Sequence, residues 1–275
     1  MIPLRRETAR QLRDLGVRPR RGLGQNFLVA PGFVARIVAA AAPRARRVLE
    51  IGPGLGALSE ALAVEAAELV LVEIDPALAE ALERRFAGAR NVRVIVGDAL
   101  EMDFAACFSG GERAVVVANL PYSVGSQILL RLLDERRRFS RLVLMLQREV
   151  AARLTASPGT EAYGIPSVWV SLYGRARTLF RVPPGAFLPR PKVESAVVSI
   201  ELRDAPAVAL DDPELFRRIV RAGFGQRRKT LRRALGDLVS AADFARAGID
   251  PRRRGETLGL EEFARLANEA AGARA

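Results

Sequence analysis

The sequence predicts an α/β fold, in which a mostly parallel seven-stranded sheet finishes antiparallel and is followed by a small all-α domain. Two observations carry this prediction. Between residues 48 and 154, short runs of β-forming apolar residues alternate with helical stretches, which is typical of βαβ units. Beyond residue 204 the pattern is helical only.

Strands are predicted where apolar residues run unbroken, because a strand covered on both faces has no polar side. They span residues 48–51, 69–74, 92–96, 114–118, 142–146, 168–173 and 193–202. The last two are expected to be joined by loops, which indicates the antiparallel finish. Helices are predicted over residues 55–67, 76–86, 126–133, 148–154, 213–222, 226–238, 241–247 and 260–271. Asp75 and Pro76 suit the N-cap and first position of the helix that they open.

Composition bounds the organisation of the chain. With 275 residues, 49% of them hydrophobic and 27% charged, it is long enough for one large domain and one small one. We expect a domain over residues 1–204, with a basic N-terminal segment over 1–47, and a helical domain over 205–275. The turn that begins at Asp204 and Pro206 marks the boundary.

Charge and residue types narrow the function. The net charge of +12 is uneven, because residues 1–47 carry +9, residues 48–204 carry −1 and residues 205–275 carry +4. Basic ends around a near-neutral middle favour a nucleic-acid partner. A single cysteine and no histidine exclude an internal disulfide, histidine bases and Cys/His metal sites, so we expect no metal. No apolar run is long enough to span a membrane and no signal peptide is evident, so we expect a cytoplasmic protein. We also expect it to be a monomer.

A glycine-rich turn follows the first predicted strand, where Gly52, Gly54 and Gly56 have the spacing G-x-G-x-G. Such a turn lets a ligand approach the backbone closely. Glu73 ends the second strand and Asp98 ends the third, at the edge where open α/β sheets bind ligands. Glu73 is placed to accept hydrogen bonds from ribose hydroxyls, and Asp98 from an adenine amine. The pattern resembles Rossmann-like S-adenosylmethionine-dependent methyltransferases; the glycine spacing argues against the competing interpretation, nicotinamide binding.

Asn119-Leu120-Pro121-Tyr122 ends the fourth predicted strand. Asn and Pro can close a strand for backbone reasons alone. However, the stretch also resembles the Asp/Asn-Pro-Pro-Tyr/Phe motif of amino-group methyltransferases. That resemblance gives each residue a role. The side-chain oxygen of Asn119 and the carbonyl of Leu120 would accept from an adenine amine, Pro121 would fix the backbone, and Tyr122 would stack on the base.

Further motifs make the chain resemble the KsgA family of rRNA adenine dimethyltransferases over nearly its whole length. They are residues 24–28 (GQNFL), 187–195 (FLPRPKVES) and 224–231 (FGQRRKTL). The resemblance implies that Phe187 stacks on the other face of the base; taken alone, Phe187 is also compatible with a core aromatic. It implies donor contacts, partly from an N-terminal segment that closes over the donor, at Gln25, Asn26, Leu28, Gly52, Gly54, Glu73, Ile74, Asp98, Ala99 and Asn119. The implied reaction transfers two methyls to each of two adjacent adenines near the 3′ end of small-subunit rRNA, late in subunit assembly.

The C-terminal basic residues are the expected RNA contacts: Arg227, Arg228, Lys229 and Arg232. On a continuous helix, Arg228 and Arg232 would share a face, which suits phosphate binding; a solvated basic face is the alternative. Two other functions stay open at this point. One is an Erm-type methyltransferase that modifies large-subunit rRNA, and the other is a non-catalytic RNA- or DNA-binding assembly or transcription factor on the same fold.

Overall fold

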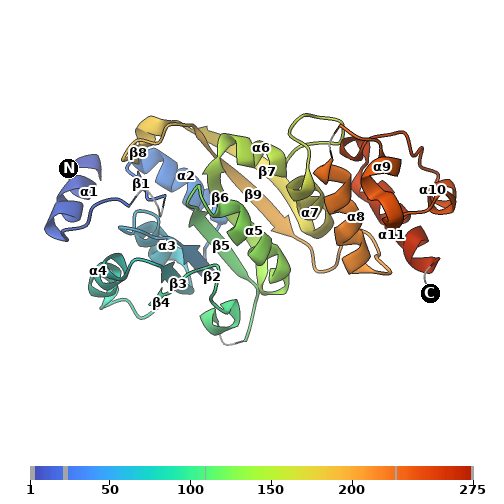
Figure 1. Cartoon of the computed structure of the whole chain (residues 1–275). Helices are drawn as coiled ribbons and strands as arrows, with labels where there is room; N and C mark the ends of the chain where they lie inside the picture. The colour runs from blue at the N-terminus through green and yellow to red at the C-terminus, as the bar shows by residue number, and fades with distance from the viewer. Residues whose placement is uncertain (1–3, 21–23, 109, 227, 274–275) are drawn as a thin grey trace. The chain divides into compact units, whose positions relative to one another are not determined.

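The structure, a computed structural model, describes residues 4–20, 24–108, 110–226 and 228–273 (Figure 1). Contacts group the chain into two units. The first comprises Met1–Ala151 with Arg177–Leu202, and the second comprises Ala152–Ala176 with Arg203–Ala275. Residues 152–176 thus group with the C-terminal helices, while the domain boundary expected at residue 204 stays a prediction.

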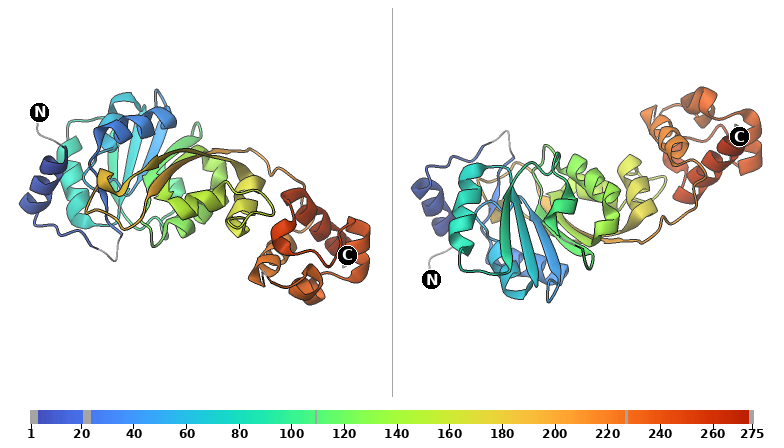
Figure 2. Two further views of the ribbon diagram at one scale, coloured as in Figure 1. Left: turned by 90° about the horizontal axis from the view of Figure 1, so that it is seen from above. Right: turned by 90° about the horizontal axis from the view of Figure 1, so that it is seen from below.

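The seven-stranded sheet has the order β4-β3-β2-β5-β6-β9-β7 (Figures 1 and 2). Strands β2, β3, β4, β5 and β6 pair in parallel, and β9 pairs antiparallel with β6. The α/β fold with an antiparallel finish is therefore confirmed. The strands are β2 Arg47–Ile51, β3 Glu68–Glu73, β4 Val92–Val96, β5 Ala114–Asn119, β6 Phe139–Gln147, β7 Gly174–Val182 and β9 Ser195–Leu202. A separate two-stranded sheet joins β1 Phe27–Leu28 to β8 Phe187–Leu188.

Both faces of the central strands are buried, which explains their unbroken apolar runs. On β5, for example, Val115 and Val117 join one core cluster, while Val116 between them is also fully buried on the opposite face. The cluster includes Ile37 of α2 and Leu62 of α3, so these two helices cover that face. Burying both faces fixes the register, because a shift of one residue would move every side chain to the other face.

Most helices lie at the predicted places, but the helices within residues 4–14, 31–41 and 165–173 were not predicted, and the helix predicted over residues 226–238 is shorter. The helices are α1 Leu4–Asp14, α2 Pro31–Ala41, α3 Ser59–Glu65, α4 Pro76–Phe86, α5 Gly125–Asp134, α6 Arg148–Leu154, α7 Ile165–Tyr173, α8 Pro213–Gly225, α9 Leu231–Leu235, α10 Ala241–Ala247 and α11 Leu260–Gly272. Short 3-10 turns lie at Phe104–Cys107, Arg136–Arg138, Pro184–Ala186, Gly236–Leu238 and Gly255–Thr257. The Asp75 side chain accepts a hydrogen bond from the Ala77 N–H (3.1 Å), as expected of an N-cap.

The strand predicted over residues 168–173 is wrong, because this segment belongs to α7. Pro166 lies in the first turn of α7, and the Ser167 hydroxyl accepts from the Gly164 N–H (3.0 Å). Val168 and Val170 suggested a strand, yet both are buried, so packing outweighed their β-propensity. The seventh strand begins only at Gly174.

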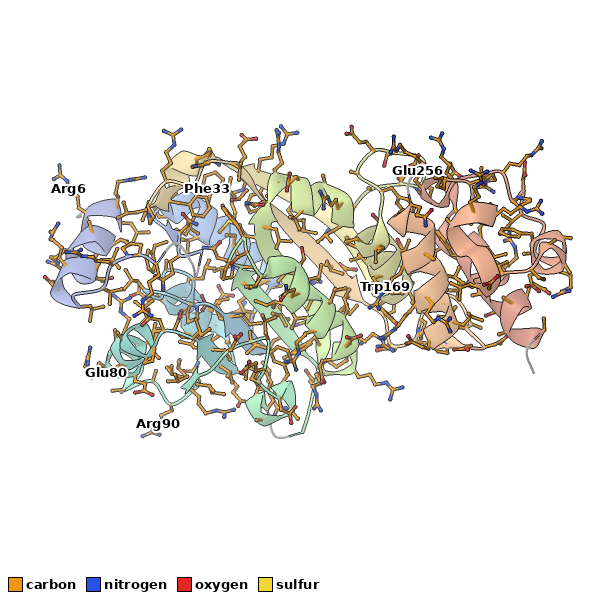
Figure 3. All side chains as sticks on the ribbon, in the orientation of Figure 1. Arg6, Phe33, Glu80, Arg90, Trp169 and Glu256 are labelled. Carbon is orange, nitrogen blue, oxygen red and sulfur yellow. The ribbon has the colours of Figure 1, made fainter. Side chains whose placement is uncertain are left out.

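The second unit is helical and contains a cluster of aromatic side chains, to which Trp169, labelled in Figure 3, belongs. Trp169 of α7 packs against Phe216 of α8 with ring centroids 5.5 Å apart, and Phe224 packs against Tyr163 and Phe263. Among the described residues, no helix is long and apolar enough to cross a membrane.

Candidate active site

Two adjoining cavities lie at the edge of the first unit's sheet where the parallel strands end, the usual ligand position in open α/β sheets. Gly52, Ile74 and Pro121 line both cavities. The first is also lined by the other expected donor-binding residues Gln25, Asn26, Leu28, Gly54, Glu73 and Asn119. The second is also lined by Asp98 and Ala99. The structure therefore brings together all the residues that the sequence assigned to the donor.

The glycine turn after β2 forms the floor of the first cavity. Gly52 and Gly54 have φ angles of 69° and 59°, a left-handed conformation that disfavours side chains. The Gly52 N–H donates to the Val72 carbonyl (2.9 Å), which ties the turn to β3. A Cβ on Gly54 would lie 3.0 Å from the Phe27 ring, so this position also leaves no room for a side chain.

Glu73 is held at the end of β3 by backbone donors. Its Oε2 accepts from the Gly54 N–H (2.9 Å), and its Oε1 accepts from the Asp75 N–H (3.0 Å). Burial raises the pKa of Glu73 above its ordinary value, while these hydrogen bonds oppose that rise. Each carboxylate oxygen can accept a second hydrogen bond, so Glu73 can hold ligand hydroxyls without releasing the turn.

Glu50 also lines the first cavity, although the sequence analysis gave it no role. It is fully buried, and its Oε2 has no hydrogen-bond partner among the described residues. Burial, with a contribution from the nearby charge of Glu73, raises the pKa of Glu50 to about 8. Burial thus favours the neutral form of the Glu50 carboxyl. Across the described part of the chain, no three His, Cys, Asp or Glu side chains gather as a metal site requires.

The second cavity combines one acid with an apolar wall. Asp98 Oδ1 accepts from the Leu100 N–H (2.8 Å), which fixes the carboxylate in the turn after β4. Ile51, Val72 and Ile128 contribute apolar surface. An acceptor at the rim of a flat apolar pocket suits a nucleobase that carries an amine.

An N-terminal segment covers the first cavity. Phe27 pairs with Leu188 and Leu28 pairs with Phe187, which ties the segment to a loop near the other end of the first unit's chain (Figure 1). Side chains of α1 also line the cavity: Leu4, Glu7, Thr8 and Gln11. Arg5 on the same helix donates to the Gly185 and Phe187 carbonyls (2.8 and 2.9 Å). Nothing in the local pattern distinguishes these α1 residues from an ordinary amphipathic helix, so the sequence analysis missed them.

Asn119 occupies the end of β5 beside both the cavity and the N-terminal segment. Its Nδ2 donates to the Asn26 carbonyl (2.9 Å), and Asn26 Nδ2 donates to the Gly24 carbonyl (3.0 Å). This assignment leaves Asn119 Oδ1 as an acceptor. The next N–H, of Leu120, bonds the Met145 carbonyl (3.1 Å), whereas no described residue donates to the Leu120 carbonyl. Two acceptors are thus available in adjacent residues.

Tyr122 and Phe187 differ in how far they are exposed, and therefore in whether a target base can reach them. The Tyr122 ring is partly exposed, and its hydroxyl bonds the Ser195 hydroxyl (2.6 Å). Phe187, by contrast, has no exposed surface and packs in the main core cluster beside Val182 and Val197. In this structure Phe187 is a core residue. The stacking of Phe187 on a target base stays a prediction, and this buried position gives it no support.

The basic C-terminal segment belongs to the second unit. The helix predicted over residues 226–238 is wrong in its first half, because Thr230 is the N-cap of α9, and α9 ends at Leu235 before Gly236. Arg228 and Lys229 thus precede the helix and Arg232 lies on it, so they do not form a helical stripe. All three are exposed, whereas Arg227 lies outside the described residues.

Comparison with solved structures supports the fold. A dimethyladenosine transferase from Plasmodium falciparum superposes with a TM-score of 0.77 at 24% identity, covering 87% of this chain and 95% of that one. The 23S rRNA methyltransferase ErmE superposes with a TM-score of 0.69 at 24% identity, covering 90% of this chain and 100% of that one. At such identities the likeness concerns the fold.

Sequence comparison is more specific. "Ribosomal RNA small subunit methyltransferase A" of Pelotomaculum thermopropionicum is 47% identical, over 94% of this chain and 93% of that protein. The protein of the same name from Syntrophotalea carbinolica is 48% identical, over 91% of this chain and 96% of that protein. The family model described as "Ribosomal RNA adenine dimethylase" matches residues 16–272. This range includes Asn119-Leu120-Pro121-Tyr122 and every residue that lines the two cavities except those of α1. The chain belongs to the ribosomal RNA adenine dimethylase family.

Proposed function

We propose that this chain is an S-adenosylmethionine-dependent enzyme that methylates the exocyclic N6 of adenines in small-subunit rRNA. Family membership and the names of the 47–48% identical relatives support the reaction and the RNA. The observation that carries the chemistry is the hydrogen bond from Asn119 Nδ2 to the Asn26 carbonyl, because it leaves the Asn119 oxygen free to accept from a substrate amine.

Each of the two cavities would hold a different portion of the donor. Glu73 would accept from the ribose hydroxyls, and the turn at Gly52 and Gly54 would lie against the methionine portion. Asp98 would accept from the adenine amine, with Ile74 against the ring. The two carboxylates, each held by backbone N–H groups, and the apolar wall match these groups. The donor supplies a methyl group on a positively charged sulfur.

The protein activates the acceptor amine by position and electrostatics. An adenine amine is a poor nucleophile because its lone pair is delocalised into the ring. Hydrogen bonds to Asn119 Oδ1 and the Leu120 carbonyl would stabilise a more tetrahedral nitrogen and direct its lone pair outward. Tyr122 would stack on the base and replace the stacking that ends when the base leaves its neighbours. Interactions that strengthen in the transition state lower the barrier.

The finer substrate assignment rests on the resemblance of the sequence motifs to the KsgA family. We infer two methyl groups on each of two adjacent adenines near the 3′ end of the rRNA, added by a cytoplasmic monomer late in small-subunit assembly. Arg227, Arg228, Lys229 and Arg232 would bind RNA phosphates. An Erm-type activity on large-subunit rRNA is disfavoured, because ErmE shares only 24% identity whereas small-subunit enzymes share 47–48%.

Mass spectrometry tests the substrate. Both ribosomal subunits are incubated with the protein and labelled donor, and modified adenines are mapped in each rRNA. Label in two adjacent small-subunit adenines is expected, whereas label confined to the large subunit would exclude the proposal.

A substitution at Asn119 tests the chemistry. Asn119→Ala should lower the single-turnover rate on saturating RNA by roughly 10²–10³-fold, by analogy with removal of an oxyanion-hole donor. Asn119→Asp keeps an acceptor in place and should retain more activity. RNA affinity should change little, because phosphate contacts dominate it. A wild-type rate in Asn119→Ala would show that the stretch is only a turn.

A further inference from the structure

Three strand ends meet beside Asn119. Strand β5 ends at Asn119, and its parallel neighbour β6 ends at Gln147. Strand β9 runs antiparallel to β6, so its first residue, Ser195, pairs with Gln147 at the same edge of the sheet. The topology therefore brings Ser195 next to Tyr122, although the two residues lie 73 positions apart in the sequence.

The contact between Tyr122 and Ser195 is a short hydrogen bond between hydroxyls, with 2.6 Å between the oxygens. Ser195 has no exposed surface, and its backbone is fixed by the β6–β9 ladder. Next to it, the Glu194 carbonyl accepts from the Arg148 N–H (2.9 Å). One partner of the bond is thus part of the rigid sheet.

Tyr122 is less constrained on its own. It lies in a turn in which the Pro121 carbonyl accepts from the Val124 and Gly125 N–H groups (3.2 and 2.9 Å). This turn fixes the Tyr122 backbone, but the ring can still rotate about its two side-chain torsions. The bond to Ser195 anchors the far end of the ring and so defines the ring plane.

We infer that Ser195 is a positioning residue for the target base, acting through the ring of Tyr122. This inference rests on the proposed stacking role of Tyr122. Stacking requires a defined ring plane, and the acceptors at Asn119 and Leu120 fix where the base must lie. Because Phe187 is buried in the core, Tyr122 is left to set the plane of the base. The hydroxyl of Ser195 thereby links the rigid sheet to the orientation of the substrate.

The test compares Ser195→Ala, Tyr122→Phe and the double variant. Each single change removes the same hydrogen bond, one from the sheet and one from the ring, so the proposal stays testable even if one variant fails to fold. Ser199→Ala is the matched control, because Ser199 lies on the same strand, is also buried, and its hydroxyl has no partner among the described residues. Tyr122→Ala tests the stacking role itself.

Two measurements distinguish a positioning role of Ser195 from a general effect on the folded structure. The first is the single-turnover methyl-transfer rate on saturating RNA. Ser195→Ala and Tyr122→Phe should each lower it about 3- to 10-fold, the range expected when one hydrogen bond is removed. The double variant should be no slower than either single one, because the two changes remove one shared interaction. Ser199→Ala should match wild type, and donor affinity should be unchanged in all of them.

The second readout replaces the target adenine with fluorescent 2-aminopurine, which reports stacking without accepting a methyl group. Fluorescence should be low in the wild-type complex, high with Tyr122→Ala and raised with Ser195→Ala. Wild-type rate and fluorescence in Ser195→Ala, or additive losses in the double variant, would overturn the inference. Unimpaired Tyr122→Ala would instead overturn the stacking role within the proposed function.

Discussion

Removing the Glu73 carboxylate should weaken donor binding and loosen the glycine turn together. In the structure its two oxygens accept from the backbone N–H groups of Gly54 and Asp75 at 2.9 and 3.0 Å. We propose that the same oxygens also hold the ribose hydroxyls of the donor. Glu73→Ala removes both carboxylate oxygens, whereas Glu73→Gln removes the charge and keeps one oxygen as an acceptor.

The magnitudes follow from these contacts. Loss of a charge-assisted hydrogen bond to the ribose should weaken donor affinity by roughly 1–3 kcal/mol, which is about 5- to 150-fold in Kd. Glu73→Ala also leaves two backbone N–H groups without acceptors, and each costs about 1–3 kcal/mol of folding free energy when it stays buried. Glu73→Gln can satisfy one of them with its single oxygen, so it should be the more stable variant.

Calorimetric titration with S-adenosylhomocysteine measures affinity without turnover, and denaturant unfolding measures stability. Glu68→Ala is the control, because Glu68 begins the same strand, far from the cavity, and its side chain forms an ion pair with Arg47 (3.2 Å). It should bind like wild type. If a folded Glu73→Gln variant bound the ligand with wild-type affinity, Glu73 would have no part in holding the donor.

Two further predictions concern RNA binding and pH. Replacing Arg228, Lys229 and Arg232 by Gln should weaken rRNA binding and flatten its salt dependence by roughly 0.7–0.9 log units for each phosphate that is no longer bound, with donor affinity unchanged. Filter binding over a salt series measures this, and the same slope as in an Arg84→Gln/Arg90→Gln control would refute it. Glu50 has a pKa of about 8 in the folded protein against an ordinary value of 4.5, so folding takes up a proton between these pH values. The free energy of unfolding should therefore fall as pH rises through this window. Glu50→Gln, neutral throughout, should show a smaller decline in denaturant titrations, because only the contribution of Glu73, whose pKa is also raised, remains.

The sequence predicts those elements of the fold that depend on neighbouring residues alone, such as buried strands and tight turns. Doubly buried strands such as residues 114–118 are visible as apolar runs, and Gly52 and Gly54 mark a turn that only glycine accommodates easily. Local pattern also explains the wrong prediction for residues 168–173. Val168 and Val170 have a high propensity for strands, but in the second unit this segment packs as a helix.

What the sequence could not reveal depends on contacts between distant segments. The bond between Tyr122 and Ser195 exists only because β9 reverses direction beside β6. A motif likewise cannot show whether the Phe187 ring faces the core or the substrate, and the structure places it in the core. The shared position of Glu73, Asp98 and Asn119 at one edge of the sheet was predictable, because each follows or ends a parallel strand. The expected contacts at Gln25, Asn26 and Leu28 came only from the family resemblance.

The pairing of β1 with β8 also has a consequence for biosynthesis. Phe27 and Leu28 emerge from the ribosome long before Leu188 and Phe187, and closing such a long loop is slow because its entropy cost comes before the contact forms. The N-terminal segment that lines the first cavity can therefore be fixed in place only after β8 has been translated. A nascent chain arrested before residue 187 would have the glycine turn and Glu73, but its cavity would lack this fixed segment.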